Sequence, residues 1–148
     1  MIPAPPVPIG ERFARQVTFD APSIRAFAAM CGDANPLHHD EAAASRTSFG
    51  TLIASGPQTA ALMMGLNATF FCAQFDALGL NFAFRFVKAV PAGTTLTLEW
   101  TVVRSEPKPS LAGHIVGVEG RAVNDEGVVF VTATGDNLVR IRSSRGTP

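Results

Sequence analysis

GPQTAALMMGL, residues 56–66, is the stretch from which the fold is predicted. Ser55 or Gly56 can cap a helix here, and Pro57 suits a first helical turn, where a backbone N–H would lack a partner anyway. The helix beyond is apolar on nearly all sides, and other structure normally covers such a helix all round. Because most of the chain after it is strand-like, we expect a β-sheet to supply that cover.

Five segments around this helix have the composition and alternation of β-strands. The clearest is residues 95–102, in which every second residue is apolar. Turn signals separate the segments, among them a break at residues 106–110 and a hairpin signal at residues 124–127. One long helix on a strongly curved antiparallel sheet is an α+β fold. The predicted strands are residues 10–19, 80–87, 95–102, 114–123 and 128–134, the last of which residues 137–142 can extend.

A polar stretch before the helix, CGDANPLHHD at residues 31–40, is the candidate for chemistry. Asp33 and His38 are five positions apart, so only a sharp chain reversal can bring their side chains together. Asn35 and Pro36 supply that reversal, because proline fixes its own φ and keeps the preceding residue out of the α region. We therefore expect an apolar helix to end near Asp33, with a carboxylate and an imidazole on a rigid loop outside the core.

The neighbours of this pair are assigned supporting roles. Asn35 locks the turn with its side chain beside Pro36, and Asp40 is the N-cap of a short helix that follows. If this segment is extended, the side chain of His39 points to the opposite side from that of His38, so we expect His39 to be exposed or to form a pocket wall. His114 lies in a strand context without an acidic neighbour in sequence and is expected at the surface.

Length and charge narrow the classes of protein that this chain can belong to. The 148 residues suffice for one domain whose core needs no disulfide or metal, and we divide them into a proline-rich arm (1–9), the domain (10–142) and a tail (143–148). Twelve acidic and twelve basic residues without a run of like charge argue against a nucleic-acid or membrane partner. The longest apolar segments contain too many polar residues to span a bilayer. The expected ligand is small.

The cysteines and the other ligand-type residues indicate no metal. Cys31 and Cys72 lie in apolar segments without metal-ligand spacing, which predicts buried free thiols in a reducing cytoplasm. No cluster of histidine, cysteine or acidic residues has the spacing of a metal site. We therefore expect a cytoplasmic protein without a metal.

Residues 32–40 resemble a known motif, the G-D-x-N-P-x-H-x-D sequence of the MaoC-like, (R)-specific enoyl-CoA hydratase family. Residues 53–63 resemble the segment that opens the central helix of that family. Residues 84–86 and 90–96 resemble the strand pair that follows it. The similarity covers about residues 10–139, and its first motif is the specific one.

The resemblance implies a hot-dog fold, in which a curved antiparallel sheet wraps a long central helix, and a homodimer or a dimer-based oligomer. It implies chemistry on an acyl thioester of coenzyme A or of acyl carrier protein, with no cofactor beyond the acyl-CoA substrate. By the resemblance, Asp33 and His38 hold and activate one water, and the Gly56 amide binds the thioester carbonyl. Hydration needs a base, an acid and a donor to the enolate-like oxygen, and these three groups can fill those roles.

The chain departs from the family pattern next to Gly56. Many members carry Trp-His where this chain has Pro57-Gln58, and chain-shortened hydratases often carry histidine at the position of Ser55. The resemblance implies that these positions line the acyl pocket. We therefore assign Ser55, Pro57 and Gln58 to substrate binding and expect them to affect the accepted acyl length.

Two other functions remain open at this point. A hot-dog thioesterase uses the same fold with a carboxylate on the central helix, but residues 60–66 contain no Asp or Glu. A non-catalytic acyl-thioester binding module would have no need of the paired Asp33 and His38. The residues do not decide acyl length, the carrier or the physiological direction.

Overall fold

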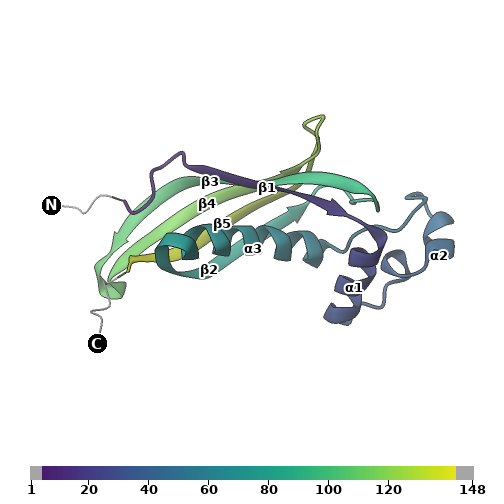
Figure 1. Ribbon diagram of the computed structural model, residues 1–148, viewed down its shortest axis with the longest axis horizontal. Helices are drawn as coiled ribbons and strands as arrows, with labels where there is room; N and C mark the ends of the chain where they lie inside the picture. Colours follow the sequence, from purple (N-terminus) through teal and green to yellow (C-terminus); the bar gives the residue numbers. More distant parts are fainter. Residues whose placement is uncertain (1–4, 143–148) are drawn as a thin grey trace.

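The protein's structure, a computed structural model, describes residues 5–142. Within these residues, a single antiparallel sheet of five strands curves along one long helix (Figure 1). The strand order across the sheet is β1-β3-β4-β5-β2. The prediction of an α+β fold with a helix on a curved sheet is confirmed. The strands are β1 (Arg12–Phe19), β2 (Phe75–Phe86), β3 (Thr94–Lys108), β4 (Gly113–Val123) and β5 (Val129–Ile141).

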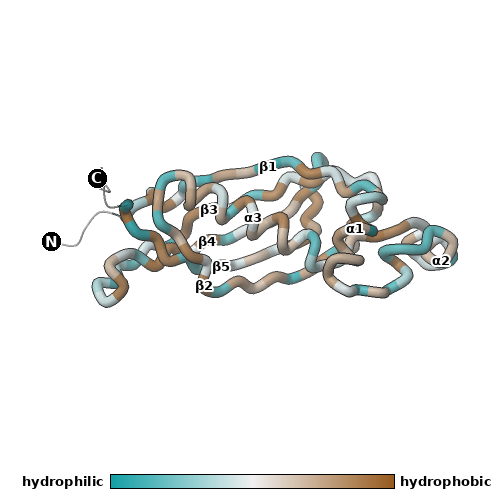
Figure 2. The backbone as a smooth tube through the Cα atoms, turned by 60° about the horizontal axis from the view of Figure 1, so that its bottom comes forward, coloured by the Kyte–Doolittle hydropathy of each residue, from teal (hydrophilic) through white to brown (hydrophobic). Residues whose placement is uncertain are grey.

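The long helix is α3 (Gly56–Gln74), which runs across one face of the sheet (Figure 2). It starts where predicted, with Pro57 in its first turn and Ser55 at the N-cap position, although the serine side chain forms no capping bond. Met63 and Phe71 are fully buried on its sheet-facing side. The indole Nε1 of Trp100 on β3 donates to the Met63 carbonyl over 2.8 Å. This bond fixes the helix against the middle of the sheet.

One side of α3 is uncovered in the single chain, so the prediction of cover on every side is wrong for this chain alone. Met64 is 41% exposed, and the small residues that share its face are exposed as well. The sheet covers the side that carries Met63 and Phe71, because it lies along one side of the helix (Figure 1). The members of this uncovered face are Ala61, Met64, Gly65, Ala68 and Cys72.

Three short helices form a lobe beyond one end of the sheet (Figure 1). They are α1 (Ala21–Cys31), the 3-10 helix η1 (Pro36–His38) and α2 (Glu41–Ser45). The Asp20 carboxylate accepts a hydrogen bond from the Ser23 amide over 2.8 Å, which caps the start of α1. Residues 52–54 lead from this lobe to α3, and the amide of Ala54 donates to the carbonyl of Val90 over 2.9 Å. The lobe is therefore fastened to the sheet at the point where α3 begins.

Two strands are longer than predicted. β2 begins at Phe75, directly after α3. The backbone is already extended at that residue, so no loop separates the helix from the strand. β3 continues through Pro107 to Lys108, so the predicted break begins only at residue 109. Proline fits there because β1 pairs with β3 only as far as Thr101, which leaves β4 as the one strand paired with this part of β3. The last strand extends to Ile141, as the sequence allowed.

Three side chains differ in burial from their predictions. Cys31 and Cys72 are free but exposed, because Cys31 lies on the outer side of the lobe and Cys72 on the uncovered face of α3. His114 is buried at 9% exposure, because β4 lies between two other strands and His114 is paired with Pro107 of β3 and Val139 of β5. Its Nε2 has no hydrogen-bond partner in the described part of the chain.

The chain ends lie partly outside the described residues. Within the predicted arm, Val7 is buried at 4% exposure and belongs to the core, so this part of the arm packs on the domain. The predicted tail, residues 143–148, lies outside the described residues. In residues 5–142 no helix has both the length and the apolar character needed to cross a membrane.

Candidate functional site

The loop between α1 and α2 holds the candidate catalytic pair. Gly32 ends α1 in the left-handed conformation, with φ of 72°, and the Asp33 amide donates to the Ala28 carbonyl over 2.9 Å. This C-terminal cap places Asp33 at the helix end, as predicted. The chain then turns through η1, so His38 comes back toward Asp33.

The side chains of Asp33 and His38 face each other. Nε2 of His38 lies 3.4 Å from Oδ2 of Asp33, and Nδ1 of His38 lies 2.7 Å from the Ile53 carbonyl oxygen. A carbonyl oxygen can only accept, so Nδ1 carries the proton and donates to Ile53. Nε2, the other ring nitrogen, faces the carboxylate. His38 is 6% exposed, so the expectation of a loop outside the core is wrong for this residue.

The three supporting residues occupy the predicted positions. The Asn35 side chain accepts from the Leu37 amide over 3.1 Å, and Pro36 forms the first turn of η1. Oδ1 of Asp33 accepts from the Asn35 amide over 3.0 Å, which leaves Oδ2 free to face the histidine. Oδ1 of Asp40 accepts from the Ala43 amide over 3.0 Å and caps α2. Every turn of the loop is therefore closed by a local hydrogen bond.

Gly56 lies at the N-terminus of α3, where its amide donates to no acceptor among the described residues. The partial positive charge of a helix N-terminus favours an anionic or carbonyl oxygen at this point. A Cβ atom at this position would approach the Phe86 ring to 2.9 Å, so glycine lets that ring lie close to the start of the helix. The free amide can therefore bind an oxygen atom of a ligand.

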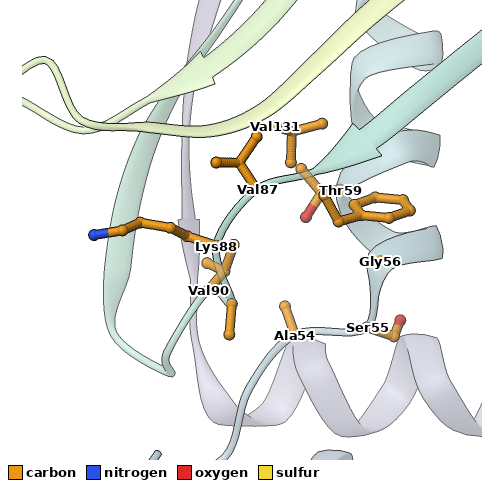
Figure 3. A pocket seen from close by; sticks show the side chains of 10 residues that line it. Ala54, Ser55, Gly56, Thr59, Val87, Lys88, Val90 and Val131 are labelled. Atoms are coloured by element: carbon orange, nitrogen blue, oxygen red, sulfur yellow. The ribbon is translucent and has the colours of Figure 1, made fainter.

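A pocket of about 250 Å³ lies against this amide (Figure 3). Thr59 from α3 and Val131 from β5 face it, and the Lys88 side chain extends away from Gly56. Prediction from the sequence named none of these residues. Lys88 lines the pocket because its amide and that of Val87, just after β2, both donate to the Phe130 carbonyl of β5. This contact joins residues far apart in the chain, so the local sequence does not indicate it.

The residues assigned to substrate binding are placed differently from one another. Ser55 lines the pocket beside Gly56, whereas Pro57 and Gln58 are not among its lining residues. Pro57 is exposed, and Gln58 is 4% exposed with its Nε2 3.5 Å from the Ser23 hydroxyl of α1. Ser55 Oγ and Gln58 Oε1 are buried without a partner in the described residues. Both side chains therefore have hydrogen-bonding capacity available near the Gly56 amide.

Asp33 and Gly56 do not line the same pocket in the single chain. Asp33 lies with His39 in an open groove of about 520 Å³ on the lobe. The link between the two places is Ile53, whose carbonyl binds His38 and whose amide donates to the Leu37 carbonyl over 3.1 Å. Ile53 precedes Gly56 by three residues, so the loop and the start of α3 form one connected unit. Across residues 5–142 no group of three histidine, cysteine or acidic residues could hold a metal ion.

Comparison with known proteins identifies chains of the same organisation. The family model described as "MaoC like domain" matches residues 6–124. The (R)-specific enoyl-CoA hydratase of Aeromonas caviae is 32% identical over 124 residues, which cover 82% of this chain and 92% of that protein.

Two solved structures support the same relationship. The MaoC-like dehydratase from Rhodospirillum rubrum superposes with a TM-score of 0.79 at 30% identity and covers 93% of this chain and 95% of its own. The (R)-hydratase from A. caviae, described as involved in PHA biosynthesis, superposes with a TM-score of 0.81 at 26% identity over 94% of this chain and all of that one. The fold shared with these structures is the hot-dog fold, and that prediction is confirmed.

Proposed function

Because the chain belongs to the MaoC-like domain family, we propose that it is a hydro-lyase of acyl thioesters. It adds water to a 2-enoyl thioester, or removes water from an (R)-3-hydroxyacyl thioester, with coenzyme A as the carrier. The single observation that carries this proposal is the pairing of Asp33 with His38, whose Oδ2 and Nε2 atoms lie 3.4 Å apart.

The two facing atoms of this pair suit the binding of one water. Nδ1–H of His38 is bound to Ile53, so when the ring is neutral and the carboxylate is ionised, Nε2 and Oδ2 are both acceptors. Their separation of 3.4 Å exceeds an ordinary hydrogen bond, and two acceptors so close need a hydrogen between or beside them. A water molecule that donates one hydrogen to each acceptor satisfies both. Its oxygen then has a free lone pair directed away from the pair.

Hydration by this arrangement balances in atoms and charge. The water oxygen bonds to the β-carbon of the enoyl group while one of its protons passes to the pair of Asp33 and His38. The π electrons move toward the thioester oxygen, and the pair then returns a proton to the α-carbon as the carbonyl re-forms. The pair is unchanged after each turnover. Dehydration is the same path in reverse.

The Gly56 amide is the group proposed to stabilise the enolate-like oxygen. Its N–H is free, it lies at the N-terminus of the 19-residue helix α3, and Gly56 lines the pocket of about 250 Å³. A fixed donor directed at developing negative charge lowers the barrier more than it stabilises the substrate. We propose that the acyl chain lies beside Ser55, Pro57 and Gln58.

The reaction as proposed requires no metal or further cofactor, because the pair supplies both proton transfers and the amide supplies the charge stabilisation. The thioesterase alternative is less favoured, since α3 carries no Asp or Glu from Gly56 to Gln74. A binding module is less favoured because the loop bonds direct one carboxylate oxygen and one ring nitrogen at each other.

Incubation with crotonyl-CoA tests the function directly. We expect loss of the enoyl absorbance with formation of (R)-3-hydroxybutyryl-CoA, identified by chiral chromatography, and equal rates in the presence of a chelator. Release of free thiol from acyl-CoA without hydration would instead identify a thioesterase. Tight binding of the substrate with neither reaction would identify a binding module. Parallel assays with crotonyl-acyl carrier protein decide the carrier.

A further inference from the structure

We propose that His39 is a positioning residue, which holds the backbone of Asp33 so that its carboxylate faces His38. This proposal rests on the proposed function, because it assigns the role through the same catalytic pair. Position 39 is the unspecified residue between the histidine and the last aspartate of the motif. The observation that points to it is a short contact between its ring Nε2 and the Asp33 carbonyl oxygen, 2.5 Å long.

The contact completes the restraint of Asp33. The amide of Asp33 is held by Ala28 at the end of α1, and its Oδ1 is held by the Asn35 amide. The carbonyl is the remaining backbone group, and its direction sets the ψ angle that orients the loop after Asp33. With His39 bound to it, every polar group of Asp33 except Oδ2 has a partner within the lobe. Oδ2 is the atom that faces His38.

His39 is itself held from both sides. Its amide donates to the Pro36 carbonyl over 3.1 Å, and its carbonyl accepts from Nε of Arg25 over 3.2 Å. Arg25 belongs to α1 and also lies 3.1 Å from the Glu41 carboxylate of α2. The backbone of His39 is thus fixed between the two helices of the lobe, and its half-buried ring reaches back across the loop to Asp33. The ring connects the last residues of the loop to the first.

The hydrogen bond to Asp33 gives His39 a role different from that of the catalytic pair. The Asp33 carbonyl can only accept, so Nε2 of His39 carries a proton and donates. Both the neutral ring with this tautomer and the charged ring can make the same bond. Nε2 of His39 is therefore occupied and does not exchange protons with the substrate. Its effect on the reaction passes through the orientation of Asp33, and small displacements of a reacting group cost large factors in rate.

The test compares His39→Phe, which keeps a ring but removes the donor, with His39→Gln, whose side-chain amide can still donate. Ser45→Ala on the exposed side of α2 is the control for a change in the same lobe. For His39→Phe we expect kcat for crotonyl-CoA to fall about tenfold with KM within about twofold of wild type, because substrate contacts are kept. His39→Gln should recover most of the loss. Thermal melting identifies any variant that fails to fold.

A second readout does not depend on turnover. The ring ¹⁵N signals of the three histidines, assigned by single substitutions, report whether the surroundings of His38 Nε2 change. We expect this signal to shift in His39→Phe and to return toward wild type in His39→Gln. A folded His39→Phe with wild-type kcat and an unchanged His38 signal would overturn the proposal. A His39→Gln as impaired as His39→Phe would overturn it too, because a side chain that can donate would then give no recovery.

The two proposals can fail separately. If the wild-type protein hydrates no enoyl thioester, the proposed function fails. The His38 signal then still decides whether His39 positions the pair, with a shift in His39→Phe supporting the contact and no shift overturning it.

Discussion

At the scale of single residues, the candidate chemistry depends on which atoms are already occupied. His38 has one ring nitrogen held by Ile53 and the other facing Asp33, and Asp33 has one carboxylate oxygen held by Asn35 and the other facing His38. Each side chain is thereby reduced to one free atom, and the two free atoms face each other. This is the reason to treat Asp33 and His38 as one unit.

Removal of either member of the pair should abolish most of the activity. We expect Asp33→Asn and His38→Ala each to lower kcat for crotonyl-CoA hydration by on the order of 10²-fold or more, because both hold the same water. The double variant should be little worse than the poorer single one, as groups acting together are not additive. Hydration kinetics of the four proteins test this. Near wild-type turnover in a folded His38→Ala would contradict the mechanism.

The structure changes the stability expected of one of these variants. His38 is buried, so His38→Ala leaves the Ile53 carbonyl without its donor and should destabilise by on the order of 1–3 kcal/mol. Asp33 is partly exposed, so Asp33→Asn should change stability by about 1 kcal/mol or less.

Gln58 is the residue at which acyl selectivity can be tested. Its Oε1 is buried without a partner in the described residues, two positions from the Gly56 amide. We expect Gln58→Ala to change the ratio of kcat/KM between crotonyl-CoA and a longer enoyl-CoA by a few-fold, because it adds apolar space near the thioester. Thr69→Ala, an exposed position on the same helix, is the control. An equal loss for every chain length would place Gln58 outside the acyl pocket.

At the scale of elements, cross-strand charge pairs join β1, β3 and β4. Glu99 on β3 binds Arg12 of β1 over 3.0 Å and also contacts Arg121 of β4. Burial raises the pKa of Glu99, but the hydrogen bonds and charges of Arg121 and Arg12 outweigh it and hold that pKa below its ordinary value of 4.5. A lowered folded-state pKa means that the charged form stabilises the fold above the ordinary pKa. This stabilisation disappears as the pH falls through the folded-state pKa.

The stability difference between wild type and Glu99→Gln should therefore depend on pH. We expect the wild type to be more stable at neutral pH by on the order of 1 kcal/mol or less, since both arginines are about half exposed or more. The difference should shrink below pH 4.5. Urea unfolding at several pH values measures it. Glu119→Gln on β4, which forms no ion pair within residues 5–142, is the control. A pH-independent difference would contradict this assignment.

At the scale of the whole molecule, the single chain leaves apolar surface that a second copy can cover. β2 is the last strand of the sheet, and Leu78 and Leu80 on it are 60% and 52% exposed. The uncovered face of α3 is also apolar, and includes Met64. An open edge strand of this length normally pairs or is blocked by charge. We propose that two copies associate through β2 and α3.

Sedimentation at micromolar concentration tests this assembly. We expect a dimer or a multiple of dimers for the wild type and a monomer for Leu80→Asp, because a buried unpaired carboxylate would oppose association. Leu111→Asp in the 3-10 helix η2 (Pro109–Leu111) alters another exposed leucine and should leave the assembly intact. A monomeric wild type, or a dimeric Leu80→Asp, would contradict the proposed interface.

The sequence by itself determined the features that local rules control. The cap signals at residues 55–57 and the apolar run after them specified α3, and the alternation of apolar residues specified the strands. Asn35, Pro36 and Asp40 specified the turns of the loop, because caps and turns act within a few residues. The reversal that brings Asp33 toward His38 was predictable for this reason. The motif then identified the family before any contact was known.

Only the tertiary structure decided what depends on residues far apart in the chain. His38 is buried against Ile53, fifteen residues later, whose carbonyl accepts a hydrogen bond from its ring, and His114 is buried because β4 lies between two strands. Cys72 is exposed because the sheet covers one side of α3, and no sequence period shows which side of a helix that is apolar all round will remain open. Burial is set by the packing of distant elements, so it follows from their arrangement in space and not from neighbouring residues.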